Sequence, residues 1–245
     1  MSKKTSIKQF LMRSGQFKKA YDCEKAIKEG KVSINDKIIT KPNFFFNPKT
    51  SIVKVDGDKM KRLPKKYYLM NKPTGYTCQK SRDIKTIYTI LEREEIEPSL
   101  ANTLFSVGRL DENTEGLLII TNDGRLSNAI ASPKNGIVKR YYSVLEKQIA
   151  PEKIKLLENG IAISIGKEQY KTKPCKVEIA GEKHAYISIS EGRKRQIKKM
   201  FDAIGNKVVY LRRISIGNIQ LESLKIGEFK EISRAEIYKK LNLLG

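Results

Sequence analysis

Hydrophobic spacing changes several times along the first 60 residues, and each change predicts an element. Apolar residues recur at helical spacing after Ser6, a good capping residue, so we expect a short helix there. A second helix is predicted over residues 18–29, with Gly30 just past its end. Short strands are predicted over residues 31–39 and 52–55, next to Asn-Asp and Asp-Gly turns. Two helices followed by a small sheet form an α+β module.

From residue 67 onward, the pattern alternates between strands and helices without an internal repeat. Short apolar runs predict strands over residues 67–70, 105–109, 117–120, 139–146, 177–179 and 185–190. Helical spacing and capping residues predict helices over residues 86–92, 125–131, 151–159 and 191–205, and a last helix that opens at a capping box, residues 233–236. The stretch between the two parts, residues 61–66, contains Pro64 and is predicted to be a linker.

The charge balance narrows the choice of partner. The 245 residues include 49 Lys and Arg against 27 Asp and Glu, a formal net charge of +22, and the first 62 residues carry 16 against 6. Such an excess favours a polyanion, because each neutralised phosphate releases a counterion. RNA or DNA fits better than an anionic membrane, since the sequence has neither a strongly amphipathic terminal helix nor an apolar run of spanning length.

The few cysteines and the single histidine limit the chemistry further. The three cysteines are widely spaced and form no Cys-x-x-Cys zinc motif, so we expect small buried thiols in a reducing cytoplasm. No secretory signal is expected, because the basic N-terminus lacks a long apolar segment. His184 alone cannot supply a two-His metal site, and it is predicted to lie in a polar hairpin loop without a catalytic role.

Residues 108–124 read GRLDENTEGLLIITNDG and are the most informative stretch of the chain. A strand breaks at Asp111, a turn rich in Asn, Thr and Gly follows, and a continuous apolar strand comes next. Asp111 therefore stands at the edge of a buried sheet, with Arg109 two residues before it. Asp often starts a turn for purely structural reasons, and composition alone favours that interpretation.

The same run resembles the signature G-R-L-D-x-x-T-x-G-L-L of bacterial rRNA pseudouridine synthases of the RsuA family, in which this Asp is catalytic. The resemblance implies that Asp111 is the catalytic carboxylate. Isomerisation of uridine to its C-glycoside breaks the N1–C1′ bond, turns the uracil and joins C5 to C1′. One carboxylate can serve as nucleophile at C1′ or as base at C2′, and the sequence leaves both roles open.

A second block, residues 191–205, reads EGRKRQIKKMFDAIG and places an apolar stripe on one helix face. At helical spacing Lys198 lies beside that stripe, whereas Arg195 and Lys199 point away. The block resembles the family motif E-G-R-x-x-Q-[IV]-[KR]-[KR]-M-F, whose cation after Ile or Val pairs with the catalytic Asp. The resemblance implies a catalytic role for Lys198. It also implies that substrate-binding residues come from both blocks and the strand between them: Arg109, Lys139, Arg193, Arg195 and Ile197.

That strand, residues 138–144, reads VKRYYSV and resembles the family motif K-x-Y-x-V, whose Tyr stacks on the target base. An ungapped count from the signature places Tyr141 at the stacking position. The V of the motif then falls on Ser143, and a register that uses Tyr142 fits the letters as well. Tyr141 is favoured, and Tyr142 remains the alternative.

The N-terminal module resembles the S4 RNA-binding domain. Its residues 29–36 read EGKVSIND, close to the E-G-x-V-x-V-N-G turn of that domain, with Asp36 where Gly is usual. Although any single lysine could be a solvated surface residue, the cluster as a whole favours phosphate contact. The predicted RNA-binding residues are Lys8, Arg13, Lys18, Lys19, Lys25 and Lys28.

Together these patterns predict an α+β protein with three parts. An S4-like module, residues 1–60, and a linker, residues 61–66, precede a catalytic domain, residues 67–245, built on a mixed, mainly antiparallel sheet flanked by helices. The resemblance implies a cytoplasmic, monomeric enzyme without metal or other cofactor that acts on ribosomal RNA, free or in an assembly intermediate. Segments such as residues 172–174 resemble the 16S rRNA branch, with a target of the uridine 516 class.

Two other functions remain open at this stage. The branch that acts on 23S rRNA is similar in the same motifs. A non-catalytic RNA-binding protein of ribosome assembly would have the same composition and charge. The joint presence of Asp111, a motif tyrosine and Lys198 favours the enzyme, because a decayed site would be expected to have lost one of them.

Overall fold

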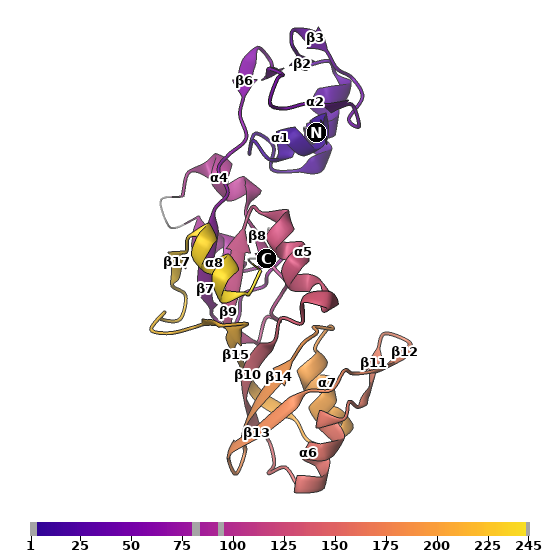
Figure 1. Ribbon diagram of the computed structural model, residues 1–245, viewed down its shortest axis with the longest axis vertical. Coiled ribbons are helices and arrows are strands. Elements are labelled where there is room, and N and C mark those ends of the chain that lie inside the picture. Colours follow the sequence, from indigo (N-terminus) through magenta and orange to yellow (C-terminus); the bar gives the residue numbers. More distant parts are fainter. Residues whose placement is uncertain (1–3, 80–83, 93–95, 244–245) are drawn as a thin grey trace. The chain divides into compact units, whose positions relative to one another are not determined.

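The computed structural model describes residues 4–79, 84–92 and 96–243 of the chain (Figure 1). These residues divide into two compact units, and each is described by itself. The first unit contains residues 1–65 and 88–105, and the second contains residues 66–87 and 106–245. Among the described residues, no helix combines the length and hydropathy that a membrane span needs.

The first unit contains the two predicted helices and small antiparallel sheets. Ser6 caps the first helix by accepting a hydrogen bond from the Gln9 N–H. Asn35 and Asp36 both have positive φ, as a tight two-residue hairpin turn requires. The predicted strand over residues 52–55 does not end the sheet, because Asp56 and Gly57 turn it into one further strand. The elements of this unit are β1 (Thr5–Ser6), α1 (Ile7–Met12), α2 (Ala20–Lys28), β2 (Val32–Ile34), β3 (Lys37–Ile38), β4 (Phe45–Phe46), β5 (Val53–Val55), β6 (Asp58–Met60) and α4 (Pro98–Thr103).

A helix distant in sequence completes this unit. Gly15 has a φ of +76°, and a Cβ at this position would lie 2.0 Å from the carbonyl oxygen of Ser99 in α4. The Asn102 side chain donates a hydrogen bond to the Gly15 carbonyl at 3.1 Å. Only a glycine allows this approach of the two backbones. The sequence patterns did not predict α4 or its return to the N-terminal module.

The second unit is built on a mixed sheet in the order β13-β14-β10-β15-β9-β7-β17. The contact between β15 and β9 is parallel and the other contacts along this order are antiparallel, so the predicted mixed, mainly antiparallel sheet is confirmed. Its strands are β7 (Tyr67–Lys72), β8 (Phe105–Val107), β9 (Glu115–Thr121), β10 (Lys139–Leu145), β13 (Lys176–Gly181), β14 (His184–Ile189), β15 (Val208–Ile216), β16 (Ile219–Gln220) and β17 (Phe229–Glu231). A separate hairpin, β11 (Ala162–Ile165) and β12 (Glu168–Lys171), was not predicted.

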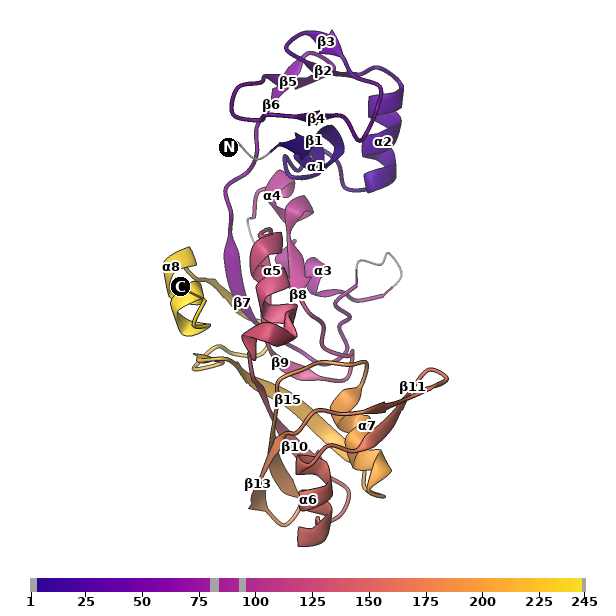
Figure 2. The same cartoon turned by 45° about the vertical axis from the view of Figure 1, so that its right-hand side comes forward.

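Helices lie against both ends of this sheet. Apolar residues of two helices join the core formed by β7 and β9, and the other two lie near β10, β13 and β14 in both views (Figure 1 and Figure 2). β9 is buried along its whole length, as its continuous apolar run predicted. The helices are α5 (Gly124–Ala131), a 3-10 turn (Pro133–Asn135), α6 (Pro151–Glu158), α7 (Gln196–Ala203) and α8 (Arg234–Lys240). All but the first residue of α3 (Ile87–Leu91) belongs to the first unit.

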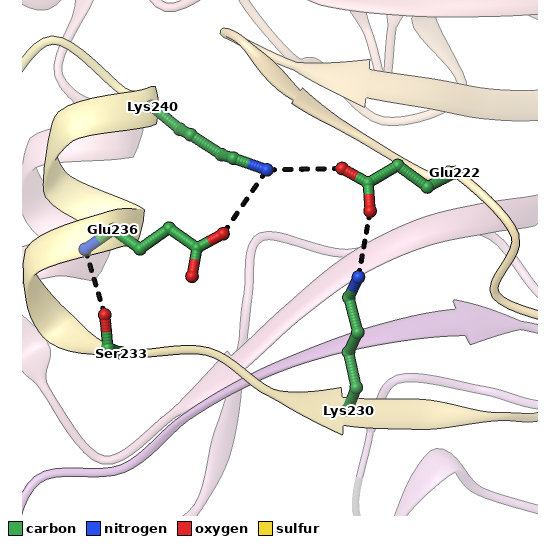
Figure 3. A network of polar contacts seen from close by, with 5 residues as sticks. All are labelled: Glu222, Lys230, Ser233, Glu236 and Lys240. Carbon is green, nitrogen blue, oxygen red and sulfur yellow. Dashed lines mark hydrogen bonds and ion pairs between the residues drawn. The ribbon is translucent and has the colours of Figure 1, made fainter.

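A polar network joins the C-terminal elements (Figure 3). Glu222 accepts ion pairs from Lys230 of β17 at 2.9 Å and from Lys240 of α8 at 3.2 Å. Ser233 caps α8 by accepting the N–H of Glu236, as predicted, whereas the Glu236 carboxylate pairs with Lys240. All these charges are partly exposed, so they orient α8 and contribute little to the free energy of unfolding.

A buried helix cap at the end of β9 contributes more to the free energy of unfolding than these exposed charges. Asp123 is 1% exposed, caps α5 by accepting the N–H of Arg125, and accepts the Tyr67 hydroxyl at 2.9 Å. Burial and the Asp123 carboxylate raise the pKa of Tyr67, so its hydroxyl stays a donor. Asp123 therefore joins β7, β9 and α5 at one point.

We predict that Asp123→Ala lowers the free energy of unfolding by about 2–4 kcal/mol, because it removes a cap and leaves the buried Tyr67 hydroxyl without its acceptor. Ser233→Ala removes an exposed cap of α8 and should cost about 0.5–1 kcal/mol. Urea unfolding of the two variants makes the comparison. Equal losses would show that the Asp123 contacts add nothing beyond capping.

Candidate active site

A cavity of about 480 Å³ opens in the second unit. Its walls come from the loop between β8 and β9, from β10 and β15, and from the loop and first turn of α7. The volume lies in the range of about 300–1,000 Å³ that small-ligand sites occupy. All eight predicted catalytic and substrate-binding residues line this cavity: Arg109, Asp111, Lys139, Tyr141, Arg193, Arg195, Ile197 and Lys198.

The loop that carries Asp111 is anchored by a buried cation. Lys72, at the end of β7, is 0% exposed, and its ammonium donates to four backbone carbonyls. The distances are 2.9 Å to Pro73, 3.2 Å to Asp111, 3.3 Å to Glu112 and 3.0 Å to Thr114. Burial lowers the pKa of Lys72, and nearby carboxylates partly offset this effect. Sequence analysis missed this function of Lys72.

Further backbone contacts hold the Asp111 loop from its other side. The Gly75 N–H donates to the Glu112 carbonyl at 2.9 Å, and the Cys78 thiol donates to the Leu110 carbonyl at 3.4 Å. The Asp111 side chain is half-buried, and within the described part of the chain it accepts no hydrogen bond and forms no ion pair within 4.0 Å. The loop thus presents a carboxylate on a rigid backbone with its oxygens unengaged by the described residues.

Gly116 of the signature allows β15 to approach this loop. Its φ is +112°, and a Cβ there would lie 2.2 Å from the carbonyl oxygen of Arg213. Arg213 and Gly116 are register partners in the parallel contact between β15 and β9. The glycine therefore brings the backbone of β15, and with it the Arg213 side chain, to the floor of the cavity.

The structure separates the two candidate tyrosines. Tyr141 is 8% exposed and lines the cavity together with Lys139. Tyr142 lies on the other face of β10, where its hydroxyl and His184 Nδ1 are 2.6 Å apart. His184 belongs to β14, so the expectation that it lies in a hairpin loop is wrong. The alternation of β10 thus favours Tyr141 as the aromatic residue that meets a ligand.

The block over residues 191–205 is a helix only from Gln196 onward. Arg195 has a φ of 54° and occupies the N-cap position, so it does not point away along a helix face. Arg193 and Arg195 are instead exposed on a loop at the mouth of the cavity. Gln196 holds this loop, because its amide donates to Glu191 at 2.7 Å and its carbonyl oxygen accepts the Arg193 N–H at 2.9 Å.

Glu191 ties the same loop to the β11–β12 hairpin. It accepts the Tyr170 hydroxyl at 2.6 Å and the Lys173 N–H at 2.9 Å. Burial alone would raise the pKa of Glu191, but these hydrogen bonds and the one from Gln196 outweigh it and lower the pKa. The Arg193 guanidinium lies 4.5 Å from the centre of the Tyr170 ring. The Glu and Gln of the motif therefore shape the loop that carries the arginines.

Lys198 is buried beside the Asp111 loop, as the helical stripe predicted. Its ammonium donates a short hydrogen bond to the Asn113 side chain, and within the described residues it forms no ion pair with Asp111 within 4.0 Å. Burial lowers the pKa of Lys198, and the nearby Asp111 carboxylate partly offsets the shift. Lys199 points elsewhere and donates to the Ser164 carbonyl of the β11–β12 hairpin.

Two more cations lie at the floor of the cavity. Lys139 donates to the Ile137 carbonyl at 3.2 Å, and burial and Arg213 lower its pKa. Arg213 is 3% exposed and donates through Nε to the Leu117 carbonyl at 2.7 Å. Sequence analysis missed Arg213. The available signal was a pair of arginines, Arg212 and Arg213, within a run rich in apolar residues over residues 208–216. Among the described residues, no group of three or more His, Cys, Asp or Glu side chains is placed to hold a metal ion.

The predicted RNA-binding residues of the first unit differ in exposure and in whether they form an ion pair. Lys8 of α1 is half-buried and forms an ion pair with Glu24 of α2. Lys25 pairs with Glu29 at 3.8 Å and is exposed. The remaining four side chains are exposed: Arg13, Lys18, Lys19 and Lys28.

Comparison with known proteins identifies relatives of the whole chain. Residues 66–203 match the family model described as RNA pseudouridylate synthase. An uncharacterized RNA pseudouridine synthase of Aquifex aeolicus is 35% identical over 98% of this chain and 94% of its own. The ribosomal small subunit pseudouridine synthase A of Haemophilus influenzae is 36% identical over 88% of this chain and 90% of its own. A crystal structure of a pseudouridylate synthase has 33% identity and a TM-score of 0.68, and the match covers 96% of this chain and 99% of that chain.

We predict that Lys198→Met reduces single-turnover rates by about 10²–10³-fold, because it removes a buried cation beside Asp111. Lys199→Met removes the same charge from the next residue, which contacts only the hairpin, and should leave the rate at saturating substrate much closer to wild type. Lys198→Arg should retain part of the activity, since it keeps the charge but not the shape. Equal rates for the two Met variants would contradict a role of Lys198 at the reacting centre.

Proposed function

The chain belongs to the RNA pseudouridylate synthase family, and from this premise we propose that it converts a uridine of 16S ribosomal RNA to pseudouridine. The enzyme is thus an isomerase that moves the attachment of uracil from N1 to C5. Relatives named for the ribosomal small subunit support the 16S target, including those of Haemophilus influenzae and Escherichia coli, the latter 33% identical over 86% of this chain. The 23S rRNA remains the alternative target.

The observation that carries the proposal is the single cavity in which Asp111, Tyr141 and Lys198 meet. Each comes from a different part of the chain, on the β8–β9 loop, β10 and α7. The Asp111 carboxylate is half-buried and accepts no hydrogen bond from the described residues, so it is available to a ligand. A non-catalytic RNA-binding protein would need no such convergence.

Asp111 is the residue proposed to react. Its carboxylate either attacks C1′ of the ribose or removes the proton from C2′, and both routes release the uracil from N1. The anchored backbone of the loop holds this carboxylate in place, so little reorganisation is needed when charge develops. The Lys198 ammonium lies close enough to Asp111 for this carboxylate to offset part of the lowered pKa of Lys198, and it donates to the Asn113 side chain of the same loop.

Tyr141 is proposed to stack on the uracil while the base is detached and turned. A base in a helical stack cannot reach a carboxylate inside a cavity, so the target nucleotide has to leave its stack. The exposed arginines of the cavity mouth, Arg109, Arg193 and Arg195, are placed to bind the phosphates around it. The S4-like module is proposed to bind, through its exposed lysines, a part of the RNA at some distance from the target nucleotide.

We predict that Asp111→Asn lowers pseudouridine formation by about 10³-fold or more, because the amide neither attacks nor removes a proton. Cells that lack the gene should be complemented with wild type or Asp111→Asn, and pseudouridine mapped across 16S and 23S rRNA. RNA affinity should stay near wild type. A wild-type modification found only in 23S rRNA would contradict the proposed target. Restoration of the modification by the Asn variant would contradict the role of Asp111.

We predict that replacing four exposed lysines of the first unit by glutamine, Lys18, Lys19, Lys25 and Lys28, flattens the slope of log K against log salt by about 3, because each phosphate contact releases a counterion. Lys8→Gln is the matched control. It removes the same charge from a residue already paired with Glu24, so its slope should change less than that of any single exposed lysine. An unchanged slope in the fourfold variant would show that the module does not bind phosphates.

A further inference from the structure

Arg213 is a buried cation whose function the proposed reaction has not yet used. Its Nε donates to the Leu117 carbonyl at 2.7 Å, and its Nη1 lies 3.5 Å from the Tyr141 hydroxyl. The guanidinium carbon is 5.9 Å from the centre of the Tyr141 ring. Its other terminal nitrogen, Nη2, is buried and has no hydrogen-bond partner in the described part of the chain. This residue lines the cavity.

The described residues around Arg213 include a second cation and no ionic partner. A guanidinium stays charged at every physiological pH, and a buried charge without an ionic partner is costly. No described carboxylate lies within 4.0 Å of Arg213, and the Lys139 ammonium is close enough for Arg213 to lower its pKa. The neighbouring Arg212, by contrast, is half-exposed and pairs with Glu115 at 3.2 Å. The two arginines therefore differ in surroundings although they are adjacent and equally charged.

We propose that Arg213 binds a carbonyl oxygen of the target uracil through its free Nη2 and stabilises the negative charge that the base gains during the reaction. The inference rests on the proposed function, and it gives Arg213 direct contact with the substrate. A base that stacks on Tyr141 lies next to this guanidinium, because the two side chains are in contact. A buried N–H directed at developing charge in a site that excludes water is worth more than the same donor in water.

The bond changes show where that charge arises. When the N1–C1′ bond breaks, its electron pair stays on N1, and the uracil becomes an anion whose charge spreads onto its carbonyl oxygens. C5 of the turned base then bonds to C1′, the C5 proton passes to solvent and N1 takes up a proton. Atoms and charge balance, since the product is an isomer of the substrate. The charge on the base is transient, so a group that stabilises it accelerates the reaction more than it strengthens binding.

A phosphate is the less suitable ligand for this donor. Arg213 is 3% exposed at the cavity floor, whereas several exposed cations already stand at its mouth. The ribose-phosphate chain of a nucleotide that enters base-first stays near those mouth residues. The chemical group that reaches the floor is therefore the base.

The test compares adjacent arginines in the full-length protein. Arg213→Lys keeps the charge but loses the planar fork, and it should reduce the single-turnover rate at saturating rRNA by about 10²-fold or more, as loss of one donor to a developing anion does. RNA affinity and its salt dependence should remain unchanged. Arg212→Lys, with Glu115 as its partner, should retain the wild-type rate. Melting temperatures of both variants check that they fold.

A second measurement begins with the wild-type enzyme alone, so its first result does not depend on the folding of a variant. Ribosomal RNA fragments with 2-thiouridine or 4-thiouridine at the mapped target replace one carbonyl oxygen by sulfur, a weaker acceptor. One of the two should slow the wild-type enzyme more than the other, and Arg213→Lys should abolish that difference. Two results would contradict the contact with the base. The wild-type enzyme could convert both thio-substituted RNAs as fast as the unmodified RNA, or sulfur substitution could slow Arg213→Lys as much as it slows wild type.

The outcomes separate the inference from the function on which it rests. Absence of pseudouridine with wild-type enzyme on every rRNA would overturn the proposed function and the Arg213 contact together. Product formation by wild type with an equal rate for Arg213→Lys would overturn the Arg213 contact alone. An unchanged saturated rate with weaker RNA affinity would show that Arg213 contributes to binding and not to the developing charge, which also overturns it.

Discussion

The ammonium of Lys72 lies beneath the loop that carries Asp111 and donates to four carbonyls within 3.3 Å. Carbonyls that converge on one point repel each other, so this turn depends on a cation at its centre. An ammonium has only three N–H donors, and two of the four carbonyls must therefore share one. The backbone of Asp111 is held rigidly by Lys72, whereas its side-chain carboxylate is not bonded to this lysine. Such a site needs little reorganisation when a substrate enters.

The parallel contact between β9 and β15 extends this arrangement to the cavity floor. Gly116, the second residue of β9, lies five residues after Asp111 and lets β15 approach within a distance that any Cβ would prevent. The close approach places Arg213 so that its Nε reaches the Leu117 carbonyl and its guanidinium touches Tyr141. The loop and the floor cation thus depend on one strand pair, and the Tyr141 ring contacts the cation from the adjacent strand β10. A change at Gly116 would displace the loop and the cation together.

Local patterns predicted much of the fold, but contacts between distant segments were beyond them. The continuous apolar run of β9 and the cap at Ser233 are local signals, and both are present as expected. Lys198 was placed correctly because its neighbours form an apolar stripe. Lys72 and Arg213 were missed since a lysine or arginine in a sequence normally indicates an exposed side chain. Their burial depends on carbonyls and a tyrosine far along the chain, as the position of α4 depends on Gly15.

The distribution of charge in the cavity accounts both for the proposed binding of the RNA backbone and for the proposed stabilisation of an anionic base. Eight lysines and arginines line it, whereas Asp111 and Glu191 are the carboxylates among its lining residues. Glu191 is held in place by three hydrogen bonds from neutral donors, and its charge partly offsets the lowered pKa of Lys139 at the floor. The exposed cations at the mouth match the permanent charge of an RNA backbone. Burial lowers the pKa of Lys139 and Lys198 because it removes water from their ammonium groups, and an anion in the cavity would offset this cost. A cavity of this kind binds a neutral base less strongly than an anionic one, and this difference is what accelerates a reaction that passes through an anion.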